Sequence, residues 1–400
     1  MRRHLVSALA LASSLASFAS FASLAACGGE EPSPKAPDGP AVASAPPPPA
    51  PAPAPVKEEP PAPKPTLAEL QQKGLVTALT GLNGHDPKAF ASVYAADGVI
   101  AVAGLNEVNG REAIAQNMAE WFETFKDVKL GFSRVWAKGE TMVLEWVING
   151  KHHGELFGVK GTEQPIGHYG LSVVTFSPDG KVVRENRYGE LGAVMTQVGA
   201  AGTKAKPRPI PSVPDKPEMI PAKGTPDEEK NVDAAKAVLA SLEGKKEADF
   251  LGALTDDMEH DGLFHLETAK GKDGAKKFYK SFTTAFPDAK FEVTKALGIG
   301  EYAIVESTMK GTHKGALGQI PATKRPVALH LVDVFRFKDG KVTRAWTYQN
   351  GLELQHQLGL FDVKPGAVPA SQAAAAKPAD AKPADAKPAD AKPASAPPKK

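Results

Sequence analysis

The chain has 400 residues, enough for two or three domains of ordinary size. Its 48 Lys and Arg residues nearly balance 46 Asp and Glu, and the net charge of +2 gives no electrostatic reason to expect nucleic acid as a partner. The single cysteine, Cys27, excludes an intramolecular disulfide and any cysteine-clustered zinc or iron–sulfur site. No His, Asp and Glu cluster has metal-ligand spacing either, so we expect no metal and no cofactor.

Residues 1–26 are typical of a secretion signal. Arg2 and Arg3 precede an uncharged run rich in Leu, Ala, Ser and Phe, whose small residues and short apolar core differ from a membrane span. The run ends in Leu24-Ala-Ala-Cys27, which resembles the bacterial lipobox, where the cysteine becomes the lipidated N-terminus. The resemblance implies a membrane anchor through Cys27 in the bacterial cell envelope, on the periplasmic face of the inner or outer membrane or at the cell surface. The alternative is an ordinary signal peptide with a chance cysteine.

Three further segments are too rich in Pro, Ala and Lys to bury a core. Residues 27–66 favour extended polyproline II, residues 201–226 are a second stretch rich in Pro and Lys that divides the chain, and residues 364–400 repeat Ala-Lys-Pro-Ala-Asp. We therefore expect a lipid-anchored disordered linker, an interdomain linker and a disordered tail. The folded domains are then residues 67–200 and 227–363.

The first domain begins with helical periodicity and ends with strands. Apolar stripes predict a helix from Leu67 to Leu82, a shorter one around Phe90 to Tyr94, and a third from Ile114 to Phe125. Strands are predicted at 142–148 and 171–176, and Pro178-Asp-Gly180 predicts a hairpin turn into 181–188.

The second domain follows the same order. An apolar stripe runs from Val232 to Leu242, and another from Phe278 to Phe286 ends at Pro287. Predicted strands follow at 291–297, 302–310, 327–337 and 341–348. Three helices followed by antiparallel strands predict the α+β class for each domain.

The two domains also repeat each other in sequence. Asp179-Gly-Lys-Val182 matches Asp339-Gly-Lys-Val342 at a spacing of 160 residues, and Gln197 with Gly199 matches Gln357 with Gly359 in the same register. So many coincidences in one register indicate a duplication.

Motifs in the second domain resemble a known family. Gly311-Thr-His313-x-Gly315, Pro321-Ala-Thr-Lys-Arg-Pro326, the segment from Val334 to Val342 and Gln357-Leu-Gly359 resemble the SnoaL-like polyketide cyclases of the nuclear transport factor 2-like superfamily. The resemblance covers nearly all of 227–363, and covers 67–200 more loosely. It implies two cone-shaped α+β barrels, each a strongly curved antiparallel sheet around about three helices and an apolar pocket. It also implies that the two domains pack as an intramolecular pseudo-dimer.

The resemblance further implies a place for a catalytic base. In the cyclases an acidic residue near the end of the last long strand removes a proton next to a carbonyl. Domain 1 has Glu190 there, whereas domain 2 has Asn350, and asparagine cannot accept a proton at neutral pH. Glu190 is therefore the candidate general base, and the alternative is a solvated charge at a strand end.

Other candidate pocket residues are histidines, aromatics and one acid near the predicted strands. His330 and Asp333 would form a polar pair if both faced inward, and Glu259-His260-Asp261 is best interpreted as a polar strand edge or turn. Most aromatic residues are expected in the core. The predicted pocket residues are His152, Tyr169, Tyr188, His313, His330, Asp333, Trp346, Tyr348 and Asn350.

Three hypotheses for function remain open at this stage. In the first, the domains bind a small apolar or amphipathic ligand or a protein partner without catalysis, because domain 2 lacks the acid. In the second, domain 1 is a cyclase, isomerase or hydrolase that uses Glu190 as general base. In the third, the chain is structural and contacts the cell wall or other proteins through its tail.

Overall fold

The computed structural model describes residues 64–200, 209–262 and 268–360. The predicted signal peptide, Cys27, all but the last three residues of the predicted N-terminal linker, and the predicted tail lie outside these residues, as does most of the interdomain linker's first half. The described parts of both domains belong to one compact unit of the chain. In the described ranges, no helix combines the length and the apolar character needed to cross a membrane.

Domain 1 opens with helices that are capped by their own sequence. Helix α1 (Leu67–Asn83) begins at Thr66, whose side chain and that of Glu69 form a capping box. Helix α2 (Pro87–Ala91) is capped by Asp86, and helix α3 is Arg111–Thr124. The stripe predicted as a helix through Tyr94 is divided, because α2 ends at Ala91 and Tyr94 begins a strand.

The sheet of domain 1 has seven strands in the order β2-β1-β6-β5-β4-β3-β7. Strand β6 is followed by the short helix α4 (Leu191–Gln197), and strand β7 comes from the segment that leads to domain 2. The strands are β1 (Tyr94–Val102), β2 (Glu107–Asn109), β3 (Phe125–Lys138), β4 (Thr141–His152), β5 (Pro165–Phe176), β6 (Val182–Gly189) and β7 (Glu218–Pro221).

Domain 2 repeats this plan with six strands in the order β10-β11-β12-β13-β8-β9. Its helices are α5 (Pro226–Glu243), α6 (Glu247–Gly252), α7 (Gly271–Ala285) and α8 (Gly351–Gln357). Its strands are β8 (Leu254–Asp261), β9 (Ala269–Lys270), β10 (Lys290–Ile299), β11 (Tyr302–Thr312), β12 (Pro326–Lys338) and β13 (Lys341–Tyr348). Glu259, His260 and Asp261 thus lie at the end of β8, which pairs with β13 on one side and with β9 on the other, and they form no turn.

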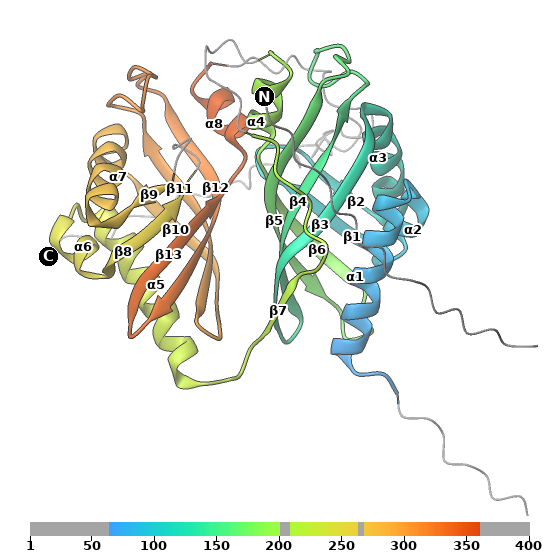
Figure 1. Cartoon of the computed structure of the whole chain (residues 1–400), viewed down its shortest axis with the longest axis horizontal. Coiled ribbons are helices and arrows are strands. Elements are labelled where there is room, and N and C mark those ends of the chain that lie inside the picture. Colours follow the sequence, from blue (N-terminus) through green and yellow to red (C-terminus); the bar gives the residue numbers. More distant parts are fainter. Residues whose placement is uncertain (1–63, 201–208, 263–267, 361–400) are drawn as a thin grey trace, which may run out of the picture. The chain divides into compact units, whose positions relative to one another are not determined.

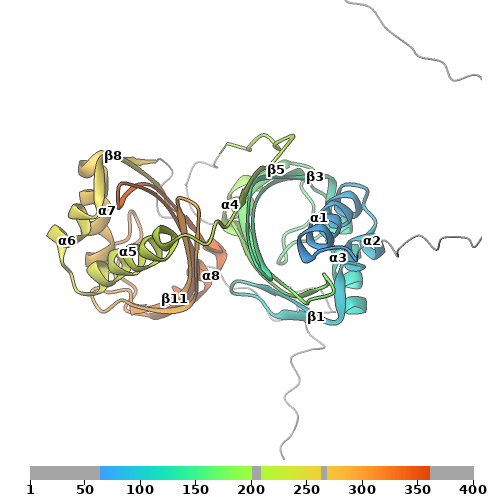
Figure 2. The ribbon, with the colours of Figure 1, turned by 90° about the horizontal axis from the view of Figure 1, so that it is seen from below.

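The α+β prediction is confirmed, but the sheets are not barrels. Each sheet curves strongly around its own helices, as Figure 2 shows, and remains open. Closure would require the two end strands of a sheet to pair, whereas β2 and β7 end one sheet and β10 and β9 end the other. Helices cover the concave side instead (Figure 1), so the curved sheet has one helix-covered inner face and one outer face.

Alternation along the strands fixes which residues share a face. On the inner faces, apolar side chains pack with the helices of the same domain into one core for each domain. On the outer faces, a third buried cluster combines residues of both sheets. Its members include Trp136, Val143, Leu171, Val173, Tyr188, Tyr302, Ile304, Val332, Val334 and Tyr348.

Hydrogen bonds link the two outer faces reciprocally. Strand pairing places Glu145, Leu171 and Tyr188 in one row of sheet 1, and Glu306, Val332 and Tyr348 in the equivalent row of sheet 2. The Tyr188 hydroxyl donates to Glu306 at 2.6 Å, and the Tyr348 hydroxyl donates to Glu145. Each glutamate thus accepts from the tyrosine of the other domain, as in an isologous dimer.

Candidate functional site

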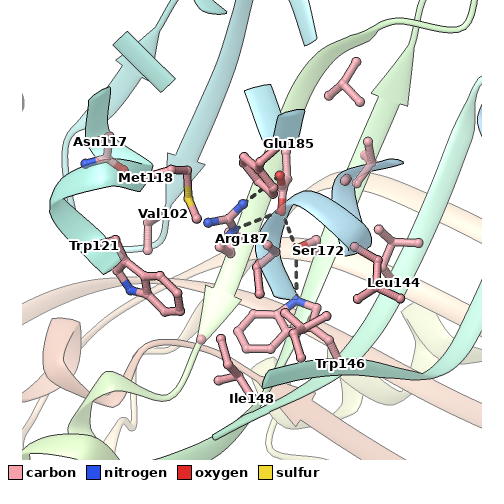
Figure 3. A pocket seen from close by; sticks show the side chains of 18 of the residues that line it. Val102, Asn117, Met118, Trp121, Leu144, Trp146, Ile148, Ser172, Glu185 and Arg187 are labelled. Atoms are coloured by element: carbon pink, nitrogen blue, oxygen red, sulfur yellow. Dashed lines mark hydrogen bonds and ion pairs between the residues drawn. The ribbon is translucent and has the colours of Figure 1, made fainter. Parts of the chain in front are cut away.

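Domain 1 contains a partly open cavity of about 210 Å³ between its helices and the inner face of its sheet. Most of its wall is apolar, and Figure 3 shows Met118, Trp121 and Trp146 around it. Two segments at its edge, the turn 102–105 and the loop 155–159, contribute lining residues as well. The other apolar lining residues include Leu75, Leu79, Leu82, Phe90, Phe125, Leu130, Phe132, Leu144, Ile148, Val174 and Phe176.

One wall of the cavity is a buried polar network centred on Glu185. This carboxylate accepts hydrogen bonds from Arg187 Nε and Nη2, each at 2.9 Å, from Ser172 Oγ at 2.7 Å and from the Tyr94 hydroxyl. The Trp146 indole N–H in turn donates to Ser172 Oγ at 3.0 Å (Figure 3). These residues come from β1, β4, β5 and β6, and alternation directs them all inward.

The network holds Glu185 ionised. Burial alone would raise the pKa of this carboxyl, but the charge of Arg187 and the hydrogen bonds that it accepts keep the pKa below its usual value. Glu185 in turn raises the pKa of Arg187 against the effect of burial. A carboxylate with four donors around it has little capacity left to accept a substrate proton, so Glu185 is poorly suited to act as a general base.

His168 lies on the same inner face and lines the cavity. Its Nδ1 is 3.1 Å from the backbone N–H of Glu190 and 3.0 Å from the carbonyl oxygen of Tyr169. Burial lowers the pKa of His168 to about 4, so the ring is neutral at pH 7 and offers a hydrogen-bonding group without charge.

None of the catalytic or pocket residues predicted from the sequence lines this cavity. Five of them line a second hollow of about 580 Å³, which is bordered by residues of both domains: Tyr169, Tyr188, Glu190, Trp346 and Tyr348. Side chains alternate between the two faces of a strand, and four of these residues lie on the outer faces of the two sheets, away from the cavity of domain 1. They are Tyr169, Tyr188, Trp346 and Tyr348.

Glu190 lies between β6 and α4, at the first residue after the strand. Its Oε1 accepts the backbone N–H of Gly351 at 3.2 Å. Asn350, its equivalent, caps α8 through a bond from the Leu352 N–H and donates from Nδ2 to the carbonyl oxygen of Ala103 at 2.8 Å. Both residues therefore bind backbone groups of the other domain, and neither faces the cavity.

Trp346 lies beside a buried ion pair on the outer faces. Arg134 pairs with Glu145 at 2.7 Å through Nε, and its guanidinium carbon lies 3.8 Å from the centre of the Trp346 ring. This geometry is a cation–π contact. Trp346 therefore contributes to the contact between the domains rather than to a pocket inside domain 2.

His152 and His313 are fully buried and equivalent. Each Nδ1 lies 3.1 Å from a threonine hydroxyl, Thr162 for His152 and Thr323 for His313, and neither Nε2 has a hydrogen-bond partner among the described residues. Burial lowers the pKa of both rings. Through these threonine contacts, each histidine holds the far end of the loop that follows the middle strand of its domain.

The structure does not bring His330 and Asp333 together. They are three positions apart on β12, so alternation directs them to opposite faces. His330 contacts Glu353 at 2.6 Å, and Asp333 accepts the Thr347 hydroxyl at 2.6 Å on the inner face. His260 Nε2 lies 3.1 Å from the same hydroxyl, and burial raises the pKa of Asp333 to about 6.

Sequence reasoning missed the polar wall of domain 1. Ser172, Glu185 and Arg187 look like ordinary exposed strand residues, because polar side chains are mostly exposed and charged ones are seldom fully buried unless they are paired. Two signals could have found them: Ser172 is equivalent to Asp333 at a spacing of 161, and Glu185 and Arg187 share one strand face. Within the residues that the structure describes, no group of three or more His, Cys, Asp or Glu side chains could hold a metal ion.

Solved structures similar to this chain each match about one domain. They include AclR, a putative hydroxylase from Streptomyces galilaeus, at 22% identity over 34% of this chain and 99% of that chain, with a TM-score of 0.31. A putative SnoaL-like polyketide cyclase from Jannaschia sp. CCS1 has 17% identity over 34% of this chain and 97% of that chain, with a TM-score of 0.32. TsrD from Streptomyces laurentii has 20% identity over 34% of this chain and 98% of that chain, with a TM-score of 0.31.

A search of curated proteins found no match. A family model described as SnoaL-like polyketide cyclase matches residues 73–198 and again residues 232–358. These two matches span both domains and together cover more than half of the 400 residues. The chain therefore belongs to the SnoaL-like polyketide cyclase family, with two family domains in tandem.

Proposed function

We propose that domain 1 binds a small amphipathic molecule in its cavity and does so without proton transfer. The observation that carries this proposal is the wall of Glu185, Arg187 and Ser172 in a cavity that is otherwise apolar. Concave apolar sites with a few placed polar groups are the usual form of small-molecule sites. The saturated Glu185 orients Arg187 and Ser172 rather than accepting a proton.

The size of the cavity limits the ligand. A volume of about 210 Å³ is below the range of about 300–1,000 Å³ common for the sites of drug-sized ligands. A single ring or a short chain with one polar group fits this volume. Because Glu185 balances the charge of Arg187, a neutral hydroxyl or carbonyl suits this wall better than a carboxylate does.

Binding of 4-fluorophenol, followed by ¹⁹F NMR, tests the proposal. This probe is one ring with one hydroxyl, and we expect its signal to broaden and shift with the mature chain. Ser172→Ala should weaken the binding several-fold. Ser133→Ala is the matched control, because Ser133 also donates to a buried glutamate, Glu145, but lies outside the cavity. Absence of binding to the wild-type chain would refute the proposal.

Acid–base catalysis in domain 2 is a second candidate function. Asp333 supports it, because this acid faces inward beside Thr347 and burial raises its pKa to about 6, which suits proton transfer near neutral pH. Glu190 as general base has less support, since its carboxylate binds the Gly351 N–H. Exchange of the α-protons of cyclohexanone in D₂O would be faster with the wild-type chain than with Asp333→Asn if this second function holds. Equal exchange rates would exclude it for this ketone.

We also propose that the two domains form an intramolecular pseudo-dimer. The reciprocal bonds of Tyr188 to Glu306 and of Tyr348 to Glu145, over a shared apolar cluster, support it. The chain should then be a monomer, with an unfolding midpoint independent of concentration. A dimer in native mass spectra would contradict this, because the outer faces would then bind a second chain.

The cell-envelope location rests on the sequence of residues 1–27 and is proposed on that basis. A lipid-anchored chain would sediment with membranes from its source cells, and Cys27→Ser would release it into the soluble fraction. Membrane association that survives this substitution would argue against an anchor at Cys27.

A further inference from the structure

The first turn of helix α8, which belongs to domain 2, touches the edge of the domain 1 cavity in two places. The first place is the turn 102–105, where Val102 and Leu105 line the cavity. Between them, the carbonyl oxygen of Ala103 accepts the Asn350 Nδ2 at 2.8 Å. A Cβ added at Gly104 would lie 2.5 Å from the Cβ of Glu353, so the backbone of this turn lies directly against α8.

The second place is the loop 155–159, on another side of the same cavity. Leu352 of α8 and Met195 of α4 form a small buried cluster, and Leu156, Phe157 and Val159 pack against it. Leu156 and Phe157 also line the cavity. Leu156 and Val159 exchange two backbone hydrogen bonds of 2.9 Å, which closes the loop on itself.

Helix α8 is fixed to domain 1 by polar contacts at its start. The Gly351 N–H donates to Glu190 Oε1 at 3.2 Å, next to Leu191, which lines the cavity. Glycine at position 192 allows this approach, because an added Cβ would lie 3.2 Å from the carbonyl carbon of Gly351. None of Asn350, Gly351 or Leu352 lines the cavity itself.

We infer that helix α8 of domain 2 positions the edge of the domain 1 cavity, with Leu352 and Asn350 as positioning residues. This inference rests on the proposed function of the cavity as a binding site. It assigns domain 2 a role in that site although domain 2 contributes no lining residue: a ligand held in domain 1 is retained only as long as α8 holds the turn 102–105 and the loop 155–159 in place.

Leu352→Ala, made in the mature chain, tests the inference. We expect the amide protons of Leu156 and Val159 to exchange about tenfold faster, because they sit in a loop that has lost its apolar support. Binding of 4-fluorophenol should weaken several-fold, mainly through faster dissociation. Leu352→Met, which keeps an apolar side chain of similar size, should restore both values.

Leu354→Ala is the matched control. Leu354 lies two positions further on α8 and is also buried, but packs into the core of domain 2. Leu354→Ala should lower the unfolding midpoint of the chain and leave the amide hydrogen exchange rates of Leu156 and Val159 close to those of the wild type. If Leu352→Ala and Leu354→Ala give the same exchange at these two amides, the inference is overturned. If the wild-type chain binds no 4-fluorophenol, the binding function fails, and the exchange experiment still decides the role of α8.

Discussion

Asp333 should make the chain less stable at neutral pH than at mildly acid pH. Its side chain lies inside domain 2, only 7% of the residue is exposed, and its carboxylate accepts a hydrogen bond from the Thr347 hydroxyl. Burial raises its pKa from 3.8 to about 6. A group whose pKa is higher in the folded state stabilises the fold while protonated, and this stability is lost as the pH rises through the folded-state pKa.

The magnitude follows from the size of the shift. A pKa that rises from 3.8 to about 6 corresponds to about 3 kcal/mol between fully protonated and fully ionised conditions. Between pH 4.5 and pH 8, about 2 kcal/mol of this should be lost, since the unfolded chain is already mostly ionised at pH 4.5. Asp333→Asn removes the titration and keeps an oxygen that can accept the Thr347 hydroxyl.

Urea unfolding of the wild-type chain and Asp333→Asn at pH 4.5 and pH 8 measures the effect as a difference between two proteins. Other titrating groups affect both proteins equally, so they cancel. We expect the variant to gain about 2 kcal/mol relative to the wild type on going from pH 4.5 to pH 8. Asp257→Asn, which replaces an exposed aspartate of the same domain, is the control and should show no such gain.

Parallel pH profiles for the wild-type chain and Asp333→Asn would refute the reasoning. They would mean that Asp333 is solvated or paired in solution, and the acid–base function proposed for domain 2 would lose its support. A carbon-13 NMR titration of the Asp333 carboxyl gives an independent reading, and a pKa near 3.8 there would have the same consequence.

Three further predictions concern buried polar groups. Glu228 accepts the backbone N–H groups of Lys223, Gly224 and Gly300, and its pKa is lowered although burial opposes this. Glu228→Ala should therefore cost about 1–3 kcal/mol in urea unfolding at pH 7, and wild type and variant should converge as the pH falls below about 4. Glu185→Gln should cost about 3–5 kcal/mol because Arg187 stays buried without its charge partner, whereas the double change to Met at both positions should recover most of that loss in the same assay. His152 and His313 should have the opposite effect to Asp333, because below pH 6.5 the unfolded state binds protons that these two buried rings resist, and His152→Gln should therefore raise the unfolding midpoint relative to the wild type more at pH 5 than at pH 8.

The sequence predicted the helices and most of the long strands, and missed strands in which the pairing register is interrupted. Strand β13 was predicted at 341–348 as observed, and β12 within one residue at each end. Strands β1, β3 and β8 were not predicted as strands. The predicted strands β10 and β12 each shift register once, but the shift extends from Tyr94 to Val99 in β1 and from Leu254 to Glu259 in β8, and β3 has two shifts, so the alternation that identifies a strand is interrupted more in these three strands.

The candidate site was harder to predict because periodicity shows which residues share a face, not which face is inside. Tyr188 and Tyr348 share a face with apolar neighbours, as core residues do, and the same pattern fits a face that packs against another domain. Glu185 and Arg187 carry charges and so look exposed. Only the structure shows that both side chains lie on the inner face of β6, where Arg187 donates to Glu185 in the wall of the cavity.

The two copies differ most where their chemistry would lie. Their outer faces keep equivalent pairs: Val143 and Ile304, Leu171 and Val332, Val173 and Val334, Tyr188 and Tyr348, Glu145 and Glu306. On the inner faces, the paired row of Ser172 and Arg187 in domain 1 becomes Asp333 and Thr347 in domain 2. Asn117, which lines the cavity, becomes Phe278, whose ring lies 4.7 Å from that of His260. Two copies can pair when their outer faces carry equivalent residues. Because the polar groups of each interior do not take part in this pairing, they can differ between the copies. After a tandem duplication, the polar groups inside one domain can therefore change while the outer faces keep the two domains in contact.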